Sequence, residues 1–175
     1  MIAALRVRLD ALEAHRARFC ATVDALPEPV QHAVPAPGAW SLAQLGEHLL
    51  RIDRGLVLGG PASFPARATS RLRAGALRGV LALPLRIPAP PGAGAILPSA
   101  GARWPGVREA WAELRASWPA AFEPLAAADL GRVAFRHPLA GPFCVADALD
   151  FLHTHHRHHD AQVRRTLAAL GARGA

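Results

Sequence analysis

The sequence predicts an all-α protein, a four-helix bundle, and three observations lead to this class. Four segments repeat apolar residues at the three- and four-residue steps of amphipathic helices. Clusters of proline and glycine separate these segments. No segment shows a convincing alternation of apolar and polar residues, the pattern of a half-buried strand. We therefore expect one domain, residues 1–175, built from four helices around a common core.

The first helix is expected from Ile2 to about Leu26, with apolar residues on one face and charged residues on the other. Two prolines directly after it end the helix. The segment 27–40, PEPVQHAVPAPGAW, contains four prolines and a glycine. We predict that this segment is a linker without regular structure.

The second helix has the clearest start in the sequence. Ser41 is suited to the N-cap, and Gln44 three residues later completes a capping box before an apolar run. Gly59 and Gly60 are predicted to close the helix. At about 100° per residue, His48 falls on the margin of the buried stripe of this helix.

Residues 63–99 are the hardest part of the chain to interpret. Thr69 to Leu83 is compatible with a basic helix, whose apolar side would comprise Leu72, Ala76, Val80 and Leu83. Pro84 to Pro98 contains five prolines and two glycines and is predicted to be a loop between the second and third main helices. Loops of this length often serve as functional lids.

The third main helix is expected to begin near Trp104, with Pro105 in its first turn, and to kink or end at Pro119, with Phe122 and Leu125 as candidates for a further turn. The segment HPLAGPF that follows is predicted to be irregular. The fourth helix is expected from about Val145 to Leu170. Cys144 stands at its N-cap position and Gly171 is suited to close it.

Charge and composition exclude several classes of protein. The net charge is +7, but all 20 basic residues are arginine and they are scattered, with a mild concentration between Arg67 and Arg86. Nucleic-acid binding is therefore disfavoured. The apolar stretch 80–97 is interrupted by an arginine and four prolines, so no membrane span is expected. Cys20 and Cys144 form no CxxC motif, which favours a reducing compartment and a cytoplasmic protein.

Five of the nine histidines lie in the tract FLHTHHRHHDAQV, residues 151–163. In a helix, His155 and His159 share one face at i and i+4, in or at the edge of the apolar stripe. His156 lies at the other edge of this stripe, while His153 and His158 point away. The tract therefore divides into histidines that face the core and histidines that face water.

A third imidazole, His48 from a facing helix, would complete a three-histidine set with His155 and His159. Zinc-like metals take three or four N, O or S ligands, and catalytic sites keep one position open. The alternative is that each is a hydrogen-bonded core residue, which is the commoner fate of a single buried histidine. Burying several neutral imidazoles together without a cation leaves ring nitrogens without partners, which favours the metal hypothesis for the set.

Three further residues are candidates around this set. His156 could substitute for one of the helical ligands. Gln162 could orient a ligand histidine through a hydrogen bond, or could be a polar surface residue. His137 precedes a proline and is either a turn residue bonded to the backbone or a residue lining the pocket.

Two patterns in this sequence resemble the DinB-like superfamily of four-helix bundles: Trp40-Ser41-x-x-Gln44-x-x-x-His48-Leu49, and the later His155-x-x-x-His159-x-x-Gln162. The pattern Phe135-x-His137-Pro138-x-x-Gly141 is similar to one branch of that family. The resemblance covers most of the chain, although 63–99 matches poorly. It implies an up-down-down-up bundle and a metal held by one histidine of the second helix and two of the last.

The resemblance also implies a class of chemistry. Members include S-transferases that use bacillithiol or mycothiol, so a metal-dependent thiol S-transferase or a related hydrolase acting on a small molecule is expected. Zinc and nickel are the metals expected first, with iron and copper as alternatives. Arg51 or Arg157 could hold an acidic thiol, although both could equally be solvated surface charges.

Two other functions stay open. One is a non-enzymatic bundle that binds a metal or ligand or forms a homodimer, which an exposed Trp104 or Trp118 would indicate. The other, less favoured, is nucleic-acid binding through the arginines of 67–86.

Overall fold

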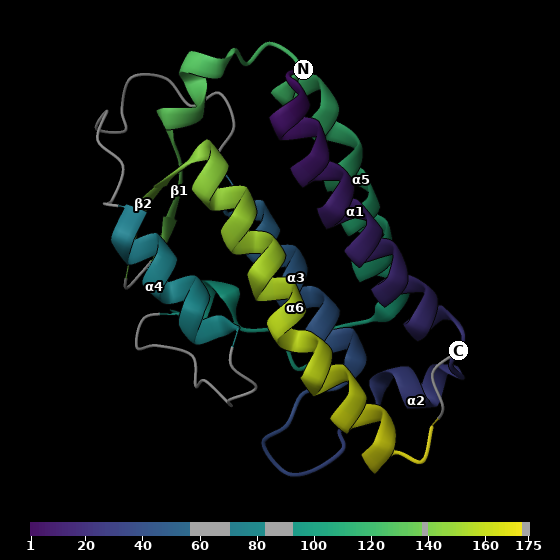
Figure 1. Cartoon of the computed structure of the whole chain (residues 1–175). Helices are drawn as coiled ribbons and strands as arrows, with labels where there is room; N and C mark the ends of the chain where they lie inside the picture. Colours follow the sequence, from purple (N-terminus) through teal and green to yellow (C-terminus); the bar gives the residue numbers. More distant parts are fainter. Residues whose placement is uncertain (57–70, 83–92, 138–139, 173–175) are drawn as a thin grey trace.

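The structure, a computed structural model, describes residues 1–56, 71–82, 93–137 and 140–172 (Figure 1). Its four long helices form a bundle: α1 (Ala3–Asp24), α3 (Leu42–Arg54), α5 (Trp104–Phe122) and α6 (Val145–Ala169). The smaller elements are α2 (Glu28–His32), α4 (Arg71–Leu81), the 3-10 turns η1 (Ala93–Ile96) and η2 (Ala127–Gly131), and the strands β1 (Val133–His137) and β2 (Gly141–Cys144). The predicted four-helix bundle is confirmed.

Contacts between the helices give their directions. Arg8 of α1 pairs with Asp150 of α6, and seven residues later His15 pairs with Asp160, so α1 and α6 run parallel. Trp111 and Arg115 of α5 bond Asp53 of α3, so these two helices pack together, and Figure 1 shows both running the opposite way to α1 and α6. The order is therefore up-down-down-up, as predicted. None of the described helices is both long and apolar enough to cross a membrane.

The predicted start of α3 is confirmed. Ser41 is the N-cap, its hydroxyl accepts a hydrogen bond from the backbone N–H of Gln44 at 3.2 Å, and the Gln44 side chain accepts one from Ser41 N–H at 2.9 Å. The helix ends at Arg54 with Gly55 as C-cap, before the predicted Gly59–Gly60, which lies outside the described residues.

The prediction that segment 27–40 lacks regular structure is wrong, because it contains α2. Pro27 and Pro29 stand at the N-cap and in the first turn of this short helix, where a missing N–H breaks no helical hydrogen bond. The buried Gln31 side chain donates to the carbonyl oxygens of Val23 and Leu26 at 3.2 and 2.9 Å, which docks α2 against the end of α1.

The prediction of no strand, with an irregular segment after residue 136, is also wrong. β1 and β2 form an antiparallel hairpin with an irregularity between Val133 and Phe135, which interrupts the expected alternation. Five- and four-residue strands are too short to be recognised by periodicity alone. Phe135 and Phe143 of the hairpin pack on Phe151 of α6, with ring centroids 5.3 and 5.4 Å away.

The basic helix predicted at 69–83 is present as α4, but two residues of its predicted apolar side are not buried; the side chains of the other two, Leu72 and Leu83, lie outside the description. Ala76 and Val80 are exposed, whereas Leu81 is buried and Leu77 packs against the core. The reason is docking on α6, where the imidazole of His158 donates to the carbonyl of Leu81 at 2.9 Å. The loop predicted at 84–98 contains the 3-10 turn η1; residues 83–92 lie outside the description.

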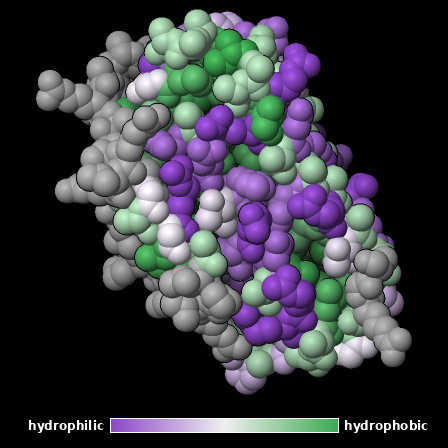
Figure 2. Space-filling model, viewed as in Figure 1, coloured by the Kyte–Doolittle hydropathy of each residue, from purple (hydrophilic) through white to green (hydrophobic). Residues whose placement is uncertain are grey.

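The remaining helix boundaries agree with the sequence. α5 begins at Trp104 and continues through Pro119 to Phe122, so the proline does not end it. α6 ends at Ala169, and Gly171 after it has a φ of +64°, the left-handed conformation that glycine adopts without strain. The outward side of α6 is largely hydrophilic (Figure 2).

Each long helix contributes one polar residue to a buried layer between two apolar clusters, and these residues are His15, Asp53, Arg115 and His156. Asp53 is fully buried and accepts hydrogen bonds from three side chains: Arg115 Nη2 (2.7 Å), Trp111 Nε1 (2.7 Å) and His156 Nε2 (2.9 Å). This carboxylate therefore connects α3, α5 and α6 in the middle of the bundle.

Removing the charge of Asp53 is expected to destabilise the fold strongly. In Asp53→Asn the buried Arg115 loses its counter-charge, and breaking a buried ion pair costs about 3–5 kcal/mol. The matched control is Asp150→Asn, whose partly exposed carboxylate pairs with Arg8 at 2.8 Å and with Arg78 at 3.5 Å, and which is expected to cost less than about 1 kcal/mol for each pair. Urea unfolding at pH 7 measures both, and equal losses would contradict the role given to Asp53.

Candidate metal centre

Three imidazoles converge between α3 and α6: His48 from α3, and His155 and His159 from successive turns of α6. The Nε2 atom of His155 lies 3.1 Å from Nε2 of His48 and 3.2 Å from Nε2 of His159. One ring nitrogen from each residue lies within 4.8 Å of the others. His48 and His159 are buried, His48 more deeply than its predicted position at the margin of the stripe, while His155 is partly exposed.

Hydrogen bonds fix the orientation of two of these rings. His48 Nδ1 lies 2.7 Å from the carbonyl oxygen of Ile96, and His159 Nδ1 lies 2.9 Å from the amide oxygen of Gln162. Both oxygens can only accept, so Nδ1 carries the proton in each ring. In both neutral rings the Nε2 lone pair therefore faces the centre of the cluster.

This arrangement cannot be satisfied by the three rings alone. His155 has one Nε2 and can donate a proton there to His48 or to His159, but not to both. The other lone pair would then face a nitrogen without a hydrogen between them. A divalent cation bound to all three nitrogens satisfies every lone pair at once, so the residues fit a metal of the class that prefers imidazole.

Burial keeps these imidazoles neutral. Desolvation lowers the pKa of His48 to about 4, partly opposed by its hydrogen bond to Ile96. Desolvation and the nearby His48 lower the pKa of His159 to about 3. Desolvation, followed by the charges of His159 and His48, holds the pKa of His155 well below its usual range. At neutral pH all three have the unprotonated form that binds a metal.

The other candidate residues lie around the cluster in different roles. Gln162 accepts the hydrogen bond from His159, as the sequence suggested. His156 does not substitute for a ligand, because it turns to the other side of α6 and bonds Asp53. His137 is the last residue of β1 and accepts a hydrogen bond from the backbone N–H of Ala140 at 3.1 Å, so it is bonded to the backbone, as one of the two alternatives expected. Its ring centroid lies 5.1 Å from that of Phe151, which in turn lies 5.5 Å from that of His155.

Two partners of the cluster were missed from the sequence. One is the carbonyl of Ile96, which has no sequence signal because every residue has one. The other is Trp40, whose ring centroid lies 4.9 Å from that of His48. Its position directly before the capping box was the available signal. Trp104 and Trp118 are buried, so the exposed tryptophan that would indicate a dimer is not found at these positions.

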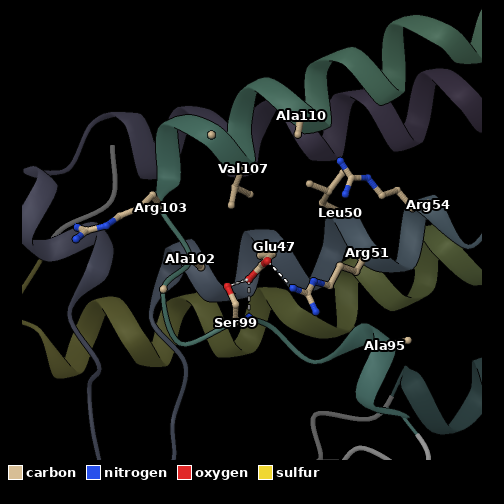
Figure 3. A pocket seen from close by; sticks show the side chains of 12 residues that line it. Glu47, Leu50, Arg51, Arg54, Ala95, Ser99, Ala102, Arg103, Val107 and Ala110 are labelled. Carbon is tan, nitrogen blue, oxygen red and sulfur yellow. Dashed lines mark hydrogen bonds and ion pairs between the residues drawn. The ribbon is translucent and has the colours of Figure 1, made fainter.

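A groove of about 580 Å³ lies between α3 and the start of α5, and the three histidines do not line it (Figure 3). Its polar lining includes Glu47, Arg51, Arg54 and Arg103. Arg51 donates to Glu47 at 2.7 Å, so one of the two arginines considered for an acidic thiol already has an anionic partner. The other, Arg157, is exposed on α6.

The protein is thus a four-helix bundle of up-down-down-up topology with three histidines brought together between α3 and α6. The DinB superfamily matches residues 11–163, most of the chain, and the protein belongs to this superfamily. Among solved structures it is similar to YfiT from Bacillus subtilis, which is described as a probable metal-dependent hydrolase with an unusual four-helix bundle topology. The TM-score is 0.62 at 20% identity, over 96% of this chain and 88% of YfiT. No curated protein matches the chain.

The metal-free protein is expected to lose stability as the pH falls from about 6.5 towards 4. Unfolded imidazoles bind protons near pH 6.5, whereas His48 and His159 stay neutral in the folded state down to about pH 4 and 3. The unfolded state then binds more protons, so acid favours unfolding, by up to about 1.4 kcal/mol per pH unit for each group.

The test is urea unfolding with a chelator at several pH values, with His48→Gln as the comparison. The variant lacks one of the depressed groups, so its free energy of unfolding is expected to depend less steeply on pH. Equal slopes for wild type and variant would show that His48 titrates normally.

Proposed function

We propose that the protein is a metal-dependent enzyme in which His48, His155 and His159 hold a divalent transition metal. The observation that carries this proposal is the convergence of three Nε2 atoms, two of them in rings whose Nδ1 is committed to an oxygen acceptor. Membership of the DinB superfamily and the description of YfiT support the same conclusion. Zinc or nickel is proposed first, since both accept imidazole ligands, with iron and copper as alternatives.

A bound cation of this kind supplies Lewis acidity, which lowers the pKa of a water or a thiol at an open position. The protein's own residues prepare the site for it. The carbonyl of Ile96 and the amide of Gln162 hold two rings with Nε2 inward. His155 is the most exposed of the three, so a small-molecule substrate is proposed to approach on its side.

Two reactions use this activation, and we propose transfer of a low-molecular-weight thiol of the bacillithiol or mycothiol type first. Hydrolysis is the closely related alternative and is supported by the description of YfiT. A thiolate attacks an electrophilic carbon and displaces its leaving group, while in hydrolysis a deprotonated water attacks a carbonyl or phosphoryl centre. Both need a nucleophile that is deprotonated at neutral pH.

A second candidate function is a bundle that binds a metal or ligand without turnover. The observation that favours it is burial: His48 and His159 are almost fully enclosed, which restricts access to the cluster. Both candidate functions predict that the protein binds a metal, but only the enzyme is expected to turn over a substrate.

Purified protein without a histidine tag is expected to contain about one divalent metal ion per chain. His155→Ala combined with His159→Ala removes two of the three proposed ligands and is expected to abolish stoichiometric metal. His153→Ala, in the same tract but outside the cluster, is the control and is expected to retain the ion. Elemental analysis after dialysis measures all three proteins, and metal retained in the double variant would contradict the site.

Turnover separates the two candidates. The metal-loaded protein is expected to accelerate conjugation of bacillithiol or mycothiol to monochlorobimane, measured by fluorescence, and the double variant is expected to match the rate without protein. Hydrolysis of an activated ester without thiol would instead identify the hydrolase. If the metal-loaded protein catalyses neither of these two reactions, the result favours the bundle that binds a metal or ligand without turnover.

A further inference from the structure

Residues 96–99 form a short segment, here called the strap, that lies along α3 beside the groove (Figure 3). Leu97 and Ser99 are exposed, Pro98 is half-buried and Ile96 packs against the core without being fully buried, so burial holds the strap weakly. Its backbone hydrogen bonds among the described residues are local, from Leu97 to Gly94 and from Ala102 to Ser99, both 3.3 Å. The strap therefore depends on side chains for its position.

Those side chains come from one face of α3, at spacings that place them in line: Gln44, Glu47, His48 and Arg51. Glu47 is central among them. Its Oε2 accepts hydrogen bonds from the backbone N–H and the hydroxyl of Ser99 at 2.7 and 2.9 Å. Its Oε1 accepts from Arg51 at 2.7 Å, and Arg51 in turn donates to the carbonyl of Leu97.

The Glu47 carboxylate thus holds the strap at two residues, directly at Ser99 and through Arg51 at Leu97. Its side chain is only 16% exposed, so these charge-assisted bonds are partly shielded from water and correspondingly strong. Without the carboxylate, the contact from Gln44 to the Ser99 carbonyl at 3.2 Å and the His48 bond itself would have to hold the strap.

The strap carries the oxygen that orients His48. The carbonyl of Ile96, three residues before Ser99, accepts the Nδ1 proton of His48 at 2.7 Å. A strap that moves away removes this acceptor, and the proton of His48 then distributes between Nδ1 and Nε2. A ring protonated at Nε2 has no lone pair directed at His155 and His159.

We propose that Glu47 is a positioning residue for His48, acting through the strap on the proposed metal site. Partners that orient a metal-ligating imidazole typically contribute about 10- to 100-fold to metal affinity. Glu47 is proposed to contribute to metal affinity indirectly, because it holds the strap, and the strap supplies the carbonyl that orients His48.

The test measures the zinc dissociation constant by competition with a chelating dye. Glu47→Ala is expected to raise it about tenfold, and Ser99→Ala is expected to raise it in the same direction. Both substitutions remove the same contact between Glu47 and Ser99. Glu47→Ala combined with Ser99→Ala is therefore expected to bind zinc no more weakly than Glu47→Ala alone. The control is Glu13→Ala, which removes a similar ion pair with Arg16 on α1 and is expected to leave zinc binding unchanged.

A second readout uses no metal. In nitrogen NMR of the imidazoles, wild-type His48 is expected to be protonated at Nδ1, and Glu47→Ala to show a mixture of both forms; Glu13→Ala is expected to resemble wild type. Unchanged zinc affinity and an unchanged His48 ring in Glu47→Ala would overturn the proposal. If Glu47→Ala does not fold, Ser99→Ala on the exposed strap supports both readouts.

The two proposals fail separately. If wild type itself binds no zinc, the proposed metal site fails, whereas the NMR comparison still decides whether Glu47 orients His48.

Discussion

The packing of the bundle depends on the hydrogen bonds that the buried carboxylate of Asp53 accepts from Trp111, Arg115 and His156. Burial alone would raise the pKa of Asp53, but His156 and Arg115 hold the pKa below its usual range, so the group stays ionised inside the protein. An ion buried in this way must keep its partners, and those partners come from α5 and α6. The need to satisfy one charge therefore fixes how α3 and α6 meet, and His48 precedes Asp53 by little more than one turn of α3.

The adjacent residues His155 and His156 illustrate the consequence. Successive residues of a helix point about 100° apart, so α6 presents one imidazole to the histidine cluster and the next to Asp53. Both are desolvated, but His156 is compensated by a carboxylate, while His155 faces two other imidazoles. The first arrangement satisfies Nε2 of His156 without any ligand. The second leaves lone pairs directed at one another, which is the state that a cation relieves.

Much of this could be predicted from the sequence because the signals are local. A capping box begins α3, and the i, i+4 spacing places His155 and His159 on one face. The missed features depend on tertiary contacts. Docking of Gln31 stabilises α2 despite its prolines, and packing on Phe151 stabilises strands too short to show a pattern. The role of Asp53 could not be predicted from the sequence, because its hydrogen-bond partners lie more than fifty residues away in the chain.

The most direct test of the central claim is a crystal structure of the purified protein with anomalous diffraction data collected at the absorption edge of the metal found in it. The account predicts one strong peak, about 2.1 Å from Nε2 of His48, His155 and His159. A peak held by other histidines such as His153 and His158, or a cluster with no peak in protein saturated with the metal, would contradict it.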